Sequence, residues 1–254
     1  MSKIQTIRGM NDIRPQETKE WTQLEGILKS IVQSYGYDEI RFPVVEKTEL
    51  YTRSNEAADI VTKEMYTFQD KGGESISLRP EGTAGCVRAA IEGDLLRTDK
   101  PRLWYSGPMF RYERPQKGRF RQFHQFSAEV FGICSAEIDA ELILLSSRIW
   151  KELGISNDVR LEINNLGDED TRSAYSRALV EFLKDEKDTL DEDTKRKLIE
   201  NPLRILDSKS SEIQNLLNKA PKIGDFIDKQ SEDHHKTVSY THLRAHETRG
   251  NRVW

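Results

Sequence analysis

Apolar residues recur every three or four positions along two long stretches of the chain, a spacing that is typical of amphipathic helices. The first stretch runs from Gln16 to Tyr35, and the second runs from Ile138 to Leu153. Gly36 and Gly154 follow these stretches directly, and glycine is the residue that most often ends a helix. The pattern therefore predicts one helix before each of these glycines.

Shorter runs are rich in β-branched and aromatic residues, which predicts strands. Tyr37 to Val45 is such a run, and Pro43 places it at a sheet edge or a bulge because proline has no N–H to donate. Two further runs, 65–68 and 75–78, flank Asp70-Lys-Gly-Gly73. The turn residues between these two runs predict a β-hairpin.

Two longer aromatic-rich runs, Arg102 to Glu113 and Arg119 to Phe131, enclose the basic loop Arg114-Pro-Gln-Lys-Gly118. They predict two long antiparallel strands joined by that loop. Val159 to Ile163 alternates apolar and polar residues, which predicts one more strand. The expected fold class is α+β, with a mostly antiparallel sheet flanked by helices.

The part of the chain after residue 168 is charged and has a helical pattern. It predicts helices over Asp170 to Leu183 and over Asp191 to Ile199. The helical pattern then continues to Asp228, with interruptions at Pro202 and Pro221 because proline breaks a helix interior.

The last residues of the chain continue none of these patterns. Val238 to Thr248 resembles a translated transposase adapter of the kind used to prepare sequencing libraries. We therefore expect residues 237–254 to be a non-native tail and leave them out of the fold. A natural basic tail that contains histidines is the alternative, and the nucleotide sequence across Lys236 would distinguish the two.

Composition limits the class of protein. The 254 residues include 39 Lys and Arg against 43 Asp and Glu, a net charge of −4, and the nine Phe, eight Tyr and four Trp argue against a disordered chain. No run approaches the roughly 18 apolar residues of a membrane span, and no signal peptide is evident, so we expect a cytoplasmic protein with no membrane partner. Cys86 and Cys134 lie far apart without metal-ligand spacing, so neither a disulfide framework nor a metal site is expected.

The strand predicted over 119–131 carries two contrasting sets of side chains, because alternate residues of a strand point to opposite faces. The odd-numbered positions hold polar or aromatic groups, namely Arg119, Arg121, Phe123, Gln125, Ser127 and Glu129. The even-numbered positions become apolar along the run, namely Gln122, His124, Phe126, Ala128 and Val130. Arg111 and Glu113 of the preceding strand have the same spacing of two.

Each group on the odd-numbered face suits part of a nucleotide or an amino acid. Guanidinium groups match phosphate oxygens, an aromatic ring stacks on a base, and a carboxylate accepts hydrogen bonds from an amine. The face therefore predicts a ligand-binding floor. A solvated face with ion pairs such as Arg111 with Glu129 is the alternative, and His124 on the other face is expected to be partly buried and hydrogen-bonded.

The segment Leu78-Arg-Pro-Glu-Gly-Thr83 leaves a strand and enters a helix predicted over Ala84 to Ile91. Its proline and glycine favour a tight turn that presents Glu81, and Thr83 is the predicted N-cap. The Glu81 carboxylate could bind the α-ammonium group of an amino acid, or it could complement the helix dipole. The pattern leaves both interpretations open.

Together, four segments resemble bacterial histidyl-tRNA synthetase, a class II aminoacyl-tRNA synthetase. They are Arg8-Gly-Met-Asn-Asp12, Lys63-Glu-Met-Tyr-Thr-Phe68, Leu78-Arg-Pro-Glu-Gly-Thr-Ala-Gly85 and the segment from Gly107 to Gln125. Phe110-Arg-x-Glu113 with the basic loop resembles the class signature called motif 2, and Arg114-Pro-Gln-Lys-Gly-Arg119 is typical of the histidine enzyme. The resemblance extends from Ile4 to about Lys236.

The resemblance implies a class II catalytic domain over residues 1–236 that is incomplete at the C-terminus. The domain, an antiparallel sheet flanked by helices, would include motif 1 over about 16–45, motif 2 over about 102–131 and the start of an inserted helical region over about 168–236. Motif 1 builds a homodimer interface in this class, so a homodimer is implied for the full-length protein.

The same resemblance implies a function and a role for individual residues. The activity would be that of a histidine–tRNA ligase, which forms histidyl-adenylate from L-histidine and ATP with Mg²⁺ and transfers histidine to tRNA(His). The catalytic Arg111 would hold the α-phosphate of ATP and the histidine carboxylate. The other ATP contacts would be Glu113 and Phe123 at adenine and Arg119 at the distal phosphates. The histidine contacts would be Glu81 and Thr83 at the amino group, and Gln125 and Glu129 in the rest of the pocket.

Some parts of the family pattern are not found in the chain. These are a second histidine-binding segment with a catalytic arginine, the motif 3 helix that covers ATP, and the anticodon-binding domain, while the loop Arg53-Ser-Asn-Glu-Ala-Ala-Asp59 is one residue short. We expect the chain to be the N-terminal part of the catalytic domain, with little or no activity alone. Loss of one transition-state donor costs a factor of roughly 10² to 10³, and here two arginines and part of the sheet are missing.

Two other classes remain as alternatives. One is a regulatory paralogue that partners a short ATP phosphoribosyltransferase, although the intact Arg111-x-Glu113, the basic loop and Phe123 argue against it. The other is a general nucleic-acid-binding module, which the net charge of −4 disfavours.

Overall fold

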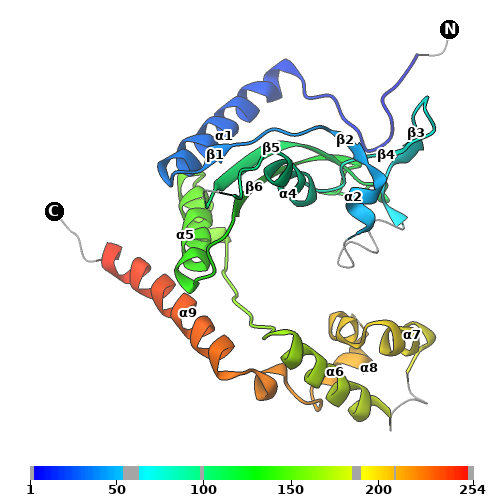
Figure 1. Ribbon diagram of the computed structural model, residues 1–254, viewed down its shortest axis with the longest axis vertical. Helices are drawn as coiled ribbons and strands as arrows, with labels where there is room; N and C mark the ends of the chain where they lie inside the picture. The colour runs from blue at the N-terminus through cyan, green and yellow to red at the C-terminus, as the bar shows by residue number, and fades with distance from the viewer. Residues whose placement is uncertain (1–2, 54–62, 98–99, 185–189, 209, 251–254) are drawn as a thin grey trace. The chain divides into compact units, whose positions relative to one another are not determined.

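The computed structural model describes residues 3–53, 63–97, 100–184, 190–208 and 210–250, so the short loop of 54–59 lies outside the described residues. The chain divides into two compact units (Figure 1). The first unit comprises residues 1–134 and 141–159, and the second comprises 135–140 and 160–254.

The central sheet of the first unit has the strand order β1-β5-β6. β1 (Asp38–Glu39) runs parallel to β5 (Arg102–Phe110), and β5 pairs antiparallel with β6 (Gln122–Val130). The two long antiparallel strands predicted from the aromatic runs are confirmed, although both are shorter than expected. A bridge between Gln116 and Arg119 closes the basic loop between them.

Helices cover both faces of this sheet. α1 (Pro15–Ser34) and α5 (Ala136–Glu152) are the two helices predicted before Gly36 and Gly154, and both glycines have positive φ. The even-numbered face packs against these helices through a core cluster of Ile31, Val32, Tyr37, Trp104, Leu145 and Ile149. α4 (Thr83–Glu92) packs on the odd-numbered face through Cys86, Ala90, Leu103, Tyr105 and Met109.

The predicted hairpin is confirmed in a second sheet of order β2-β4-β3. β3 (Thr67–Gln69) pairs antiparallel with β4 (Ser75–Leu78), which also pairs with β2 (Val45–Lys47), and α2 (Thr48–Thr52) follows β2. In the turn, Asp70 Oδ1 accepts hydrogen bonds of 2.8 Å from the amides of Gly72 and Glu74, and Gly73 has a φ of 85°.

One strand prediction is confirmed only in part, and another is wrong. The run from Tyr37 to Val45 forms strand only near its ends, because the segment turns away from β5 after the Ile40 amide donates to the Trp104 carbonyl at 2.9 Å. Val159 to Ile163 alternates between half-buried and exposed residues as a strand would, but it pairs with no other strand in the described part of the chain. A period of two specifies an extended conformation, whereas a strand also needs a neighbour for its hydrogen bonds.

The second unit is helical, as its pattern predicts. It contains α6 (Glu169–Lys184), α7 (Glu192–Glu200), α8 (Ser211–Leu217), α9 (Lys229–Gly250) and the 3₁₀ turns η4 (Pro202–Asp207) and η5 (Ile223–Phe226), while η2 (Ser156–Asp158) belongs to the first unit. Asp191 caps α7, since its carboxylate accepts a 2.7 Å hydrogen bond from the Thr194 amide. The core of the unit contains Leu179, Leu183, Leu190, Leu198, Ile205 and Ile213.

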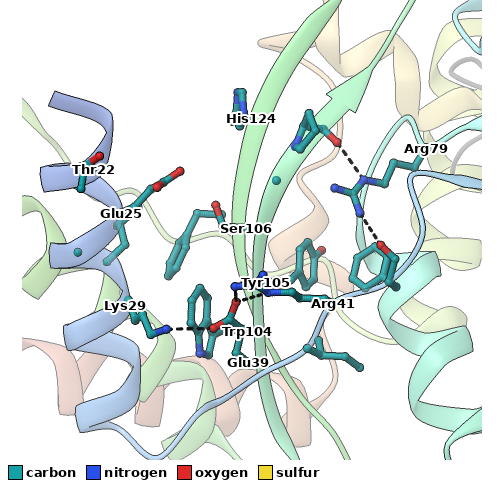
Figure 2. A pocket seen from close by; sticks show the side chains of 17 residues that line it. Thr22, Glu25, Lys29, Glu39, Arg41, Arg79, Trp104, Tyr105, Ser106 and His124 are labelled. Carbon is teal, nitrogen blue, oxygen red and sulfur yellow. Dashed lines mark hydrogen bonds and ion pairs between the residues drawn. The ribbon is translucent and has the colours of Figure 1, made fainter. Parts of the chain in front are cut away.

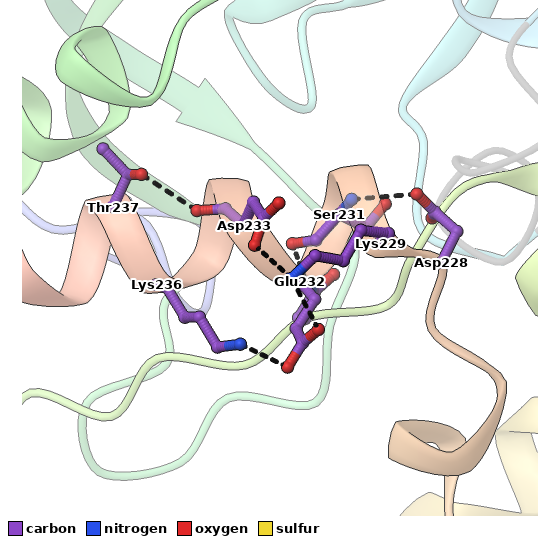
Figure 3. Close-up of polar contacts among 8 residues, drawn as sticks. Asp228, Lys229, Ser231, Glu232, Asp233, Lys236 and Thr237 are labelled. Carbon is purple, nitrogen blue, oxygen red and sulfur yellow. Dashed lines mark hydrogen bonds and ion pairs between the residues drawn. The ribbon is translucent and has the colours of Figure 1, made fainter.

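α9 begins with local polar contacts (Figure 3). Asp228 accepts a 2.9 Å hydrogen bond from the Ser231 amide, and Lys229 pairs with Asp233 at 2.9 Å. The helix continues to Gly250, and Val238 in it is buried, so the segment left out of the fold begins as a continuation of α9. The foreign origin of that segment stays a prediction. No helix among the described residues is both long and apolar enough to cross a membrane.

Candidate functional site

The strand register places the predicted site residues of β6 on one face of the sheet. Phe123, Gln125 and Glu129 lie directly opposite Met109, Gly107 and Leu103 of β5, and α4 packs on this same face. The prediction that the odd-numbered side chains share one face is therefore confirmed for the residues within β6, whereas Arg119 and Arg121 lie outside this strand. Their roles toward ligands stay predictions.

Thr83 and Glu129 are far apart in the chain but in contact in the structure. The Thr83 hydroxyl donates to Glu129 Oε1 at 2.9 Å, and the hydroxyl of Tyr105 donates to the same oxygen at 3.2 Å. Burial raises the pKa of Tyr105 to about 12, so this hydroxyl stays protonated and remains a donor. The sequence analysis missed Tyr105, although its position two residues before Gly107 places it on the same alternating face.

A glycine is required beside this cluster. A Cβ on Gly82 would lie 2.1 Å from the Tyr105 ring, a distance that no packed side chain tolerates. Gly82 therefore allows the turn to pass close to the ring and brings Thr83 within hydrogen-bond distance of Glu129.

Glu81 caps α4, and the prediction of Thr83 as N-cap is wrong. Gly82 is the N-cap residue, and the Glu81 carboxylate accepts hydrogen bonds from the amides of Thr83 and, at 3.1 Å, Ala84. The Thr83 hydroxyl is directed to Glu129 instead of to the helix terminus. The interpretation of Glu81 as a partner of the helix N-terminus thus agrees with these hydrogen bonds, while its half-buried carboxylate retains acceptor capacity for an ammonium group.

Arg111 lies against both the aromatic ring and the turn. Its guanidinium carbon is 5.1 Å from the centre of the Phe123 ring, and its Nε donates to the Pro80 carbonyl at 2.8 Å. The ion pair between Arg111 and Glu129, proposed as the alternative to a ligand site, does not form between these described residues; Glu129 Oε1 instead accepts from the hydroxyls of Thr83 and Tyr105. Arg111 therefore has a fixed orientation and keeps terminal donors for an anion.

Glu113 and Arg119, at the two ends of the basic loop, form an ion pair at 3.3 Å. The Arg119 side chain is 64% exposed, and exposed pairs of this kind contribute only about 0 to 1 kcal/mol. A phosphate group could therefore replace Glu113 as the partner of Arg119 at little cost. Arg121, also predicted on this face, instead lies 3.9 Å from the centre of the Tyr112 ring.

Gln125 carries a buried amide oxygen with no hydrogen-bond partner among the described residues. An unsatisfied buried acceptor costs about 1 to 3 kcal/mol. A ligand N–H directed at this oxygen would satisfy it, whereas the space over Gly107, directly opposite Gln125, is taken by the Arg79 guanidinium.

A cavity of about 600 Å³ is lined by α1, β5 and the segment 39–42 (Figure 2). Its lining includes Glu25 and Lys29 of α1 together with Glu39, Trp104 and His124, and Lys29 pairs with Glu39 at 3.2 Å. None of the predicted ATP- or histidine-binding residues lines it. Tyr105 and Gly107 of the odd-numbered face do line it, so the cavity adjoins the predicted site without including the predicted ligand contacts.

His124 borders this cavity and differs from its prediction. Its ring lies 4.5 Å from the Trp21 ring, centre to centre, and within the described residues it makes no hydrogen bond. Burial lowers the pKa of His124 from its usual value. The residue is partly buried as expected, but an aromatic contact takes the place of the predicted hydrogen bond.

The described residues do not by themselves form a Mg²⁺ site. Within them, no group of three or more His, Cys, Asp or Glu side chains converges in a way that could hold a metal ion. Mg²⁺ in nucleotide sites is bound largely by phosphate oxygens and water.

The fold and the site define the class of protein. An antiparallel sheet with Arg111-x-Glu113 before a basic loop, and Phe123 after it on the same face, is the arrangement of a class II aminoacyl-tRNA synthetase. The family model described as histidyl-tRNA synthetase matches residues 9–222. The apo histidyl-tRNA synthetase of S. aureus is 35% identical with a TM-score of 0.74. The chain therefore belongs to the histidyl-tRNA synthetase family.

The extent of these matches differs between relatives. The S. aureus match covers 94% of this chain and 54% of that enzyme, so the chain spans about half the length of that relative. Two structures at 18% identity share the fold: an ATP phosphoribosyltransferase regulatory subunit/histidyl-tRNA synthetase from Bacillus halodurans and a histidine–tRNA ligase subunit from Alicyclobacillus acidocaldarius. The Bacillus halodurans match has a TM-score of 0.63 and covers 96% of this chain and 66% of that protein. The Alicyclobacillus acidocaldarius match has a TM-score of 0.57 and covers 98% of this chain and 78% of that protein.

Proposed function

We propose that the site activates L-histidine with ATP and serves a histidine–tRNA ligase that charges tRNA(His) in the cytoplasm. The observation that carries the proposal is the position of Arg111 between the Phe123 ring and the turn that holds Glu81. We further propose that the full-length protein is a homodimer and that the 254-residue chain alone has little or no activity.

On the nucleotide side, an adenine ring would stack on Phe123 beside the Arg111 guanidinium. The histidine carboxylate would attack the α-phosphorus in line, and pyrophosphate would leave. Arg111 would stabilise the charge that develops on the α-phosphate oxygens, because its orientation is already set by the Pro80 carbonyl. Glu113 would accept from the adenine amine once Arg119 turns to the distal phosphates. ATP would bring the Mg²⁺, which supplies further neutralisation of phosphate charge.

On the histidine side, the free acceptors match a cationic ligand rich in N–H donors. Glu81 and Thr83 lie at the start of α4, where the carboxylate could accept from an α-ammonium group. Glu129 is held by two hydroxyl groups, and the Gln125 amide oxygen has no protein donor in the described residues. These acceptors favour histidine, whose ammonium and imidazole groups both donate. No side-chain nucleophile is required, since positioning and charge stabilisation suffice for adenylation.

A regulatory subunit without ligase activity is the second candidate. The fold shared with the Bacillus halodurans structure supports it, because the name of that protein includes an ATP phosphoribosyltransferase regulatory subunit. Such a subunit could retain the histidine contacts and bind histidine without exchanging pyrophosphate. Pyrophosphate exchange therefore separates the two candidates.

ATP–pyrophosphate exchange dependent on histidine tests the proposal. The assay compares the 254-residue chain with a chain extended through a complete catalytic domain. The matched control is the extended chain with Arg111→Lys, which keeps the positive charge but loses the planar guanidinium that can bind an anion through two donors. We expect exchange only in the extended chain, with a large loss in the control. Histidine binding without exchange in either chain would support the regulatory subunit, and exchange at full rate in the short chain would contradict the predicted inactivity.

A further inference from the structure

Arg79 is the one buried charged residue that the described part of the chain contains, with 6% of its surface exposed. Glu46 is close enough to act on it electrostatically, but Glu46 forms its ion pair with Arg88, and no carboxylate within the described residues pairs directly with Arg79. Burial lowers the pKa of Arg79 from its usual value, but an arginine stays charged at neutral pH. A buried charge without a counter-ion must be held by hydrogen bonds, because desolvation is costly otherwise.

The hydrogen bonds of Arg79 join two segments that do not pair with each other (Figure 2). Its Nε donates to the Pro108 carbonyl of β5 at 2.9 Å, and its Nη1 donates to the Phe42 carbonyl at 3.1 Å. Its backbone amide donates to Val44 at 2.9 Å, and its carbonyl accepts from Phe110 at 3.0 Å. Side chain and backbone thus connect the same two segments.

Proline explains why a side chain is needed at this point. Pro43 and Pro108 have no N–H, so a regular ladder between their segments would lack donors. The Arg79 guanidinium provides donors to carbonyls of both segments and also lies 5.1 Å from the centre of the Phe42 ring. It therefore replaces strand pairing where the chain cannot form it.

The turn that carries the candidate histidine contacts begins at the next residue. The Pro80 carbonyl accepts from Arg111 Nε at 2.8 Å, and Glu81 and Thr83 follow within three residues. A displacement of Arg79 would therefore move the acceptor of Arg111 and the start of α4 together.

Gly107 makes room for the guanidinium. A Cβ on Gly107 would lie 2.5 Å from Nη2 of Arg79, so any other residue would push the guanidinium away from its two carbonyl partners. Gly107 also lies opposite Gln125, which links this contact to the odd-numbered face.

We propose that Arg79 is a positioning residue that holds the Glu81–Thr83 turn and the Arg111 acceptor in register with β5. The placement of the turn is a property of the folded chain alone. Its consequence for histidine rests on the proposed function.

Amide hydrogen exchange on the 254-residue chain tests the positioning. In Arg79→Lys, a single ammonium cannot reach both segments as the guanidinium fork does. We expect the Thr83 and Ala84 amides, which bond to Glu81, to exchange roughly tenfold faster relative to the β6 amides. The matched control is Arg102→Lys at the other end of β5, where Arg102 pairs with Glu141 at 2.7 Å. That variant is expected to change stability without singling out the turn.

Two further variants keep the test decisive. Gly107→Ala retains Arg79 but displaces its guanidinium, so this variant should also make the same two amides exchange faster. When combined with Arg79→Lys, Gly107→Ala should increase the exchange rate of these amides little further. In Arg79→Ala, methylguanidinium should restore slow exchange while methylammonium should not, because Arg79 borders the open 600 Å³ cavity. The proposal would be overturned if amide exchange became faster by the same factor at the turn and throughout β5 and β6. It would also be overturned if neither Arg79→Lys nor Gly107→Ala made the turn amides exchange faster.

The extended chain tests the consequence for histidine. Arg79→Lys should raise the KM for histidine in pyrophosphate exchange roughly tenfold, with a smaller change in the KM for ATP. An equal rise in both would indicate general destabilisation and would overturn a specific role in histidine binding. If the wild-type extended chain shows no exchange, the proposed function fails, while the amide exchange of the turn still decides the positioning.

Discussion

The two faces of the β5–β6 pair use the same strands for different tasks. The even-numbered face is a packing surface, where Trp104 and Phe126 contact each other and meet α1 and α5. The odd-numbered face combines packing at Met109 and Tyr105 with polar groups at Gln125 and Glu129. Since alternate residues point to opposite sides, one strand can anchor the fold on one face and present chemistry on the other.

The faces also differ in how their polar atoms are satisfied. On the odd-numbered face, Glu129 has two hydroxyl donors and Arg111 has a carbonyl acceptor, so protein contacts orient both groups. A buried polar atom without a partner in the described residues occurs on both faces, Gln125 Oε1 on the odd-numbered face and Trp104 Nε1 on the even-numbered face, but on the even-numbered face apolar packing dominates. Substitutions on the even-numbered face should therefore affect stability, while those on the odd-numbered face should affect ligand chemistry.

Trp104→Ala should have the largest effect on stability. The side chain is 4% exposed and lies between the two helices, so its removal should lower the free energy of unfolding by about 3 to 5 kcal/mol. Denaturant unfolding followed by circular dichroism measures this. Trp104→Phe is the control and should cost much less, because it keeps most of the packing and removes the unpaired N–H. Equal losses in both variants would contradict a packing role.

Arg111→Gln should affect catalysis far more than stability. The substitution removes the cation beside Phe123, so histidine-dependent exchange in the extended chain should fall by a factor of roughly 10² to 10³. Urea unfolding of the same variant should show only the loss of the bond to Pro80, about 0.5 to 1.5 kcal/mol. A loss of exchange that merely follows the fraction of unfolded protein would argue against a catalytic role.

Tyr105→Phe tests a polar contact on the odd-numbered face without changing its packing. The variant removes the hydroxyl that donates to Glu129, so stability should fall by about 0.5 to 1.5 kcal/mol. In Thr83→Ala/Tyr105→Phe the Glu129 carboxylate loses both donors, and the combined cost should exceed the sum of the single costs. Additive costs in this double-mutant cycle would show that the two hydroxyls act independently.

His124 should give the smallest effect, through pH. Its pKa is lowered by burial and, to a lesser extent, by Arg79, while Glu25 opposes the shift. The folded state therefore favours the neutral ring of His124. The contribution of this ring to the free energy of unfolding is fully present above the pKa of the unfolded state, about 6.5, and is lost as pH falls through the lower pKa of the folded state. As pH is lowered from about 7.5 to about 5.5, the urea concentration at the midpoint of unfolding should fall less in His124→Gln than in the wild type. Parallel profiles would exclude His124 as the source.

Local patterns predicted the helices, the hairpin and the alternating face because each depends on neighbouring residues. The helix ends at Gly36 and Gly154 and the Asp70 turn need only backbone preferences and nearby hydrogen bonds. The strand predicted over Val159 to Ile163 failed because pairing requires a second segment. The N-cap at Thr83 failed because a distant carboxylate, Glu129, takes the hydroxyl.

The sequence by itself determined the period of each element, the grouping of Phe123, Gln125 and Glu129 on one face, and the resemblance to the histidyl-tRNA synthetase family. Only the tertiary structure decided which groups meet across the chain. Tyr105 and Thr83 reach Glu129, and Arg79 joins segments around Phe42 and Pro108. The reason is physical: side-chain direction follows from the local backbone, whereas a hydrogen bond between distant residues depends on how whole elements pack.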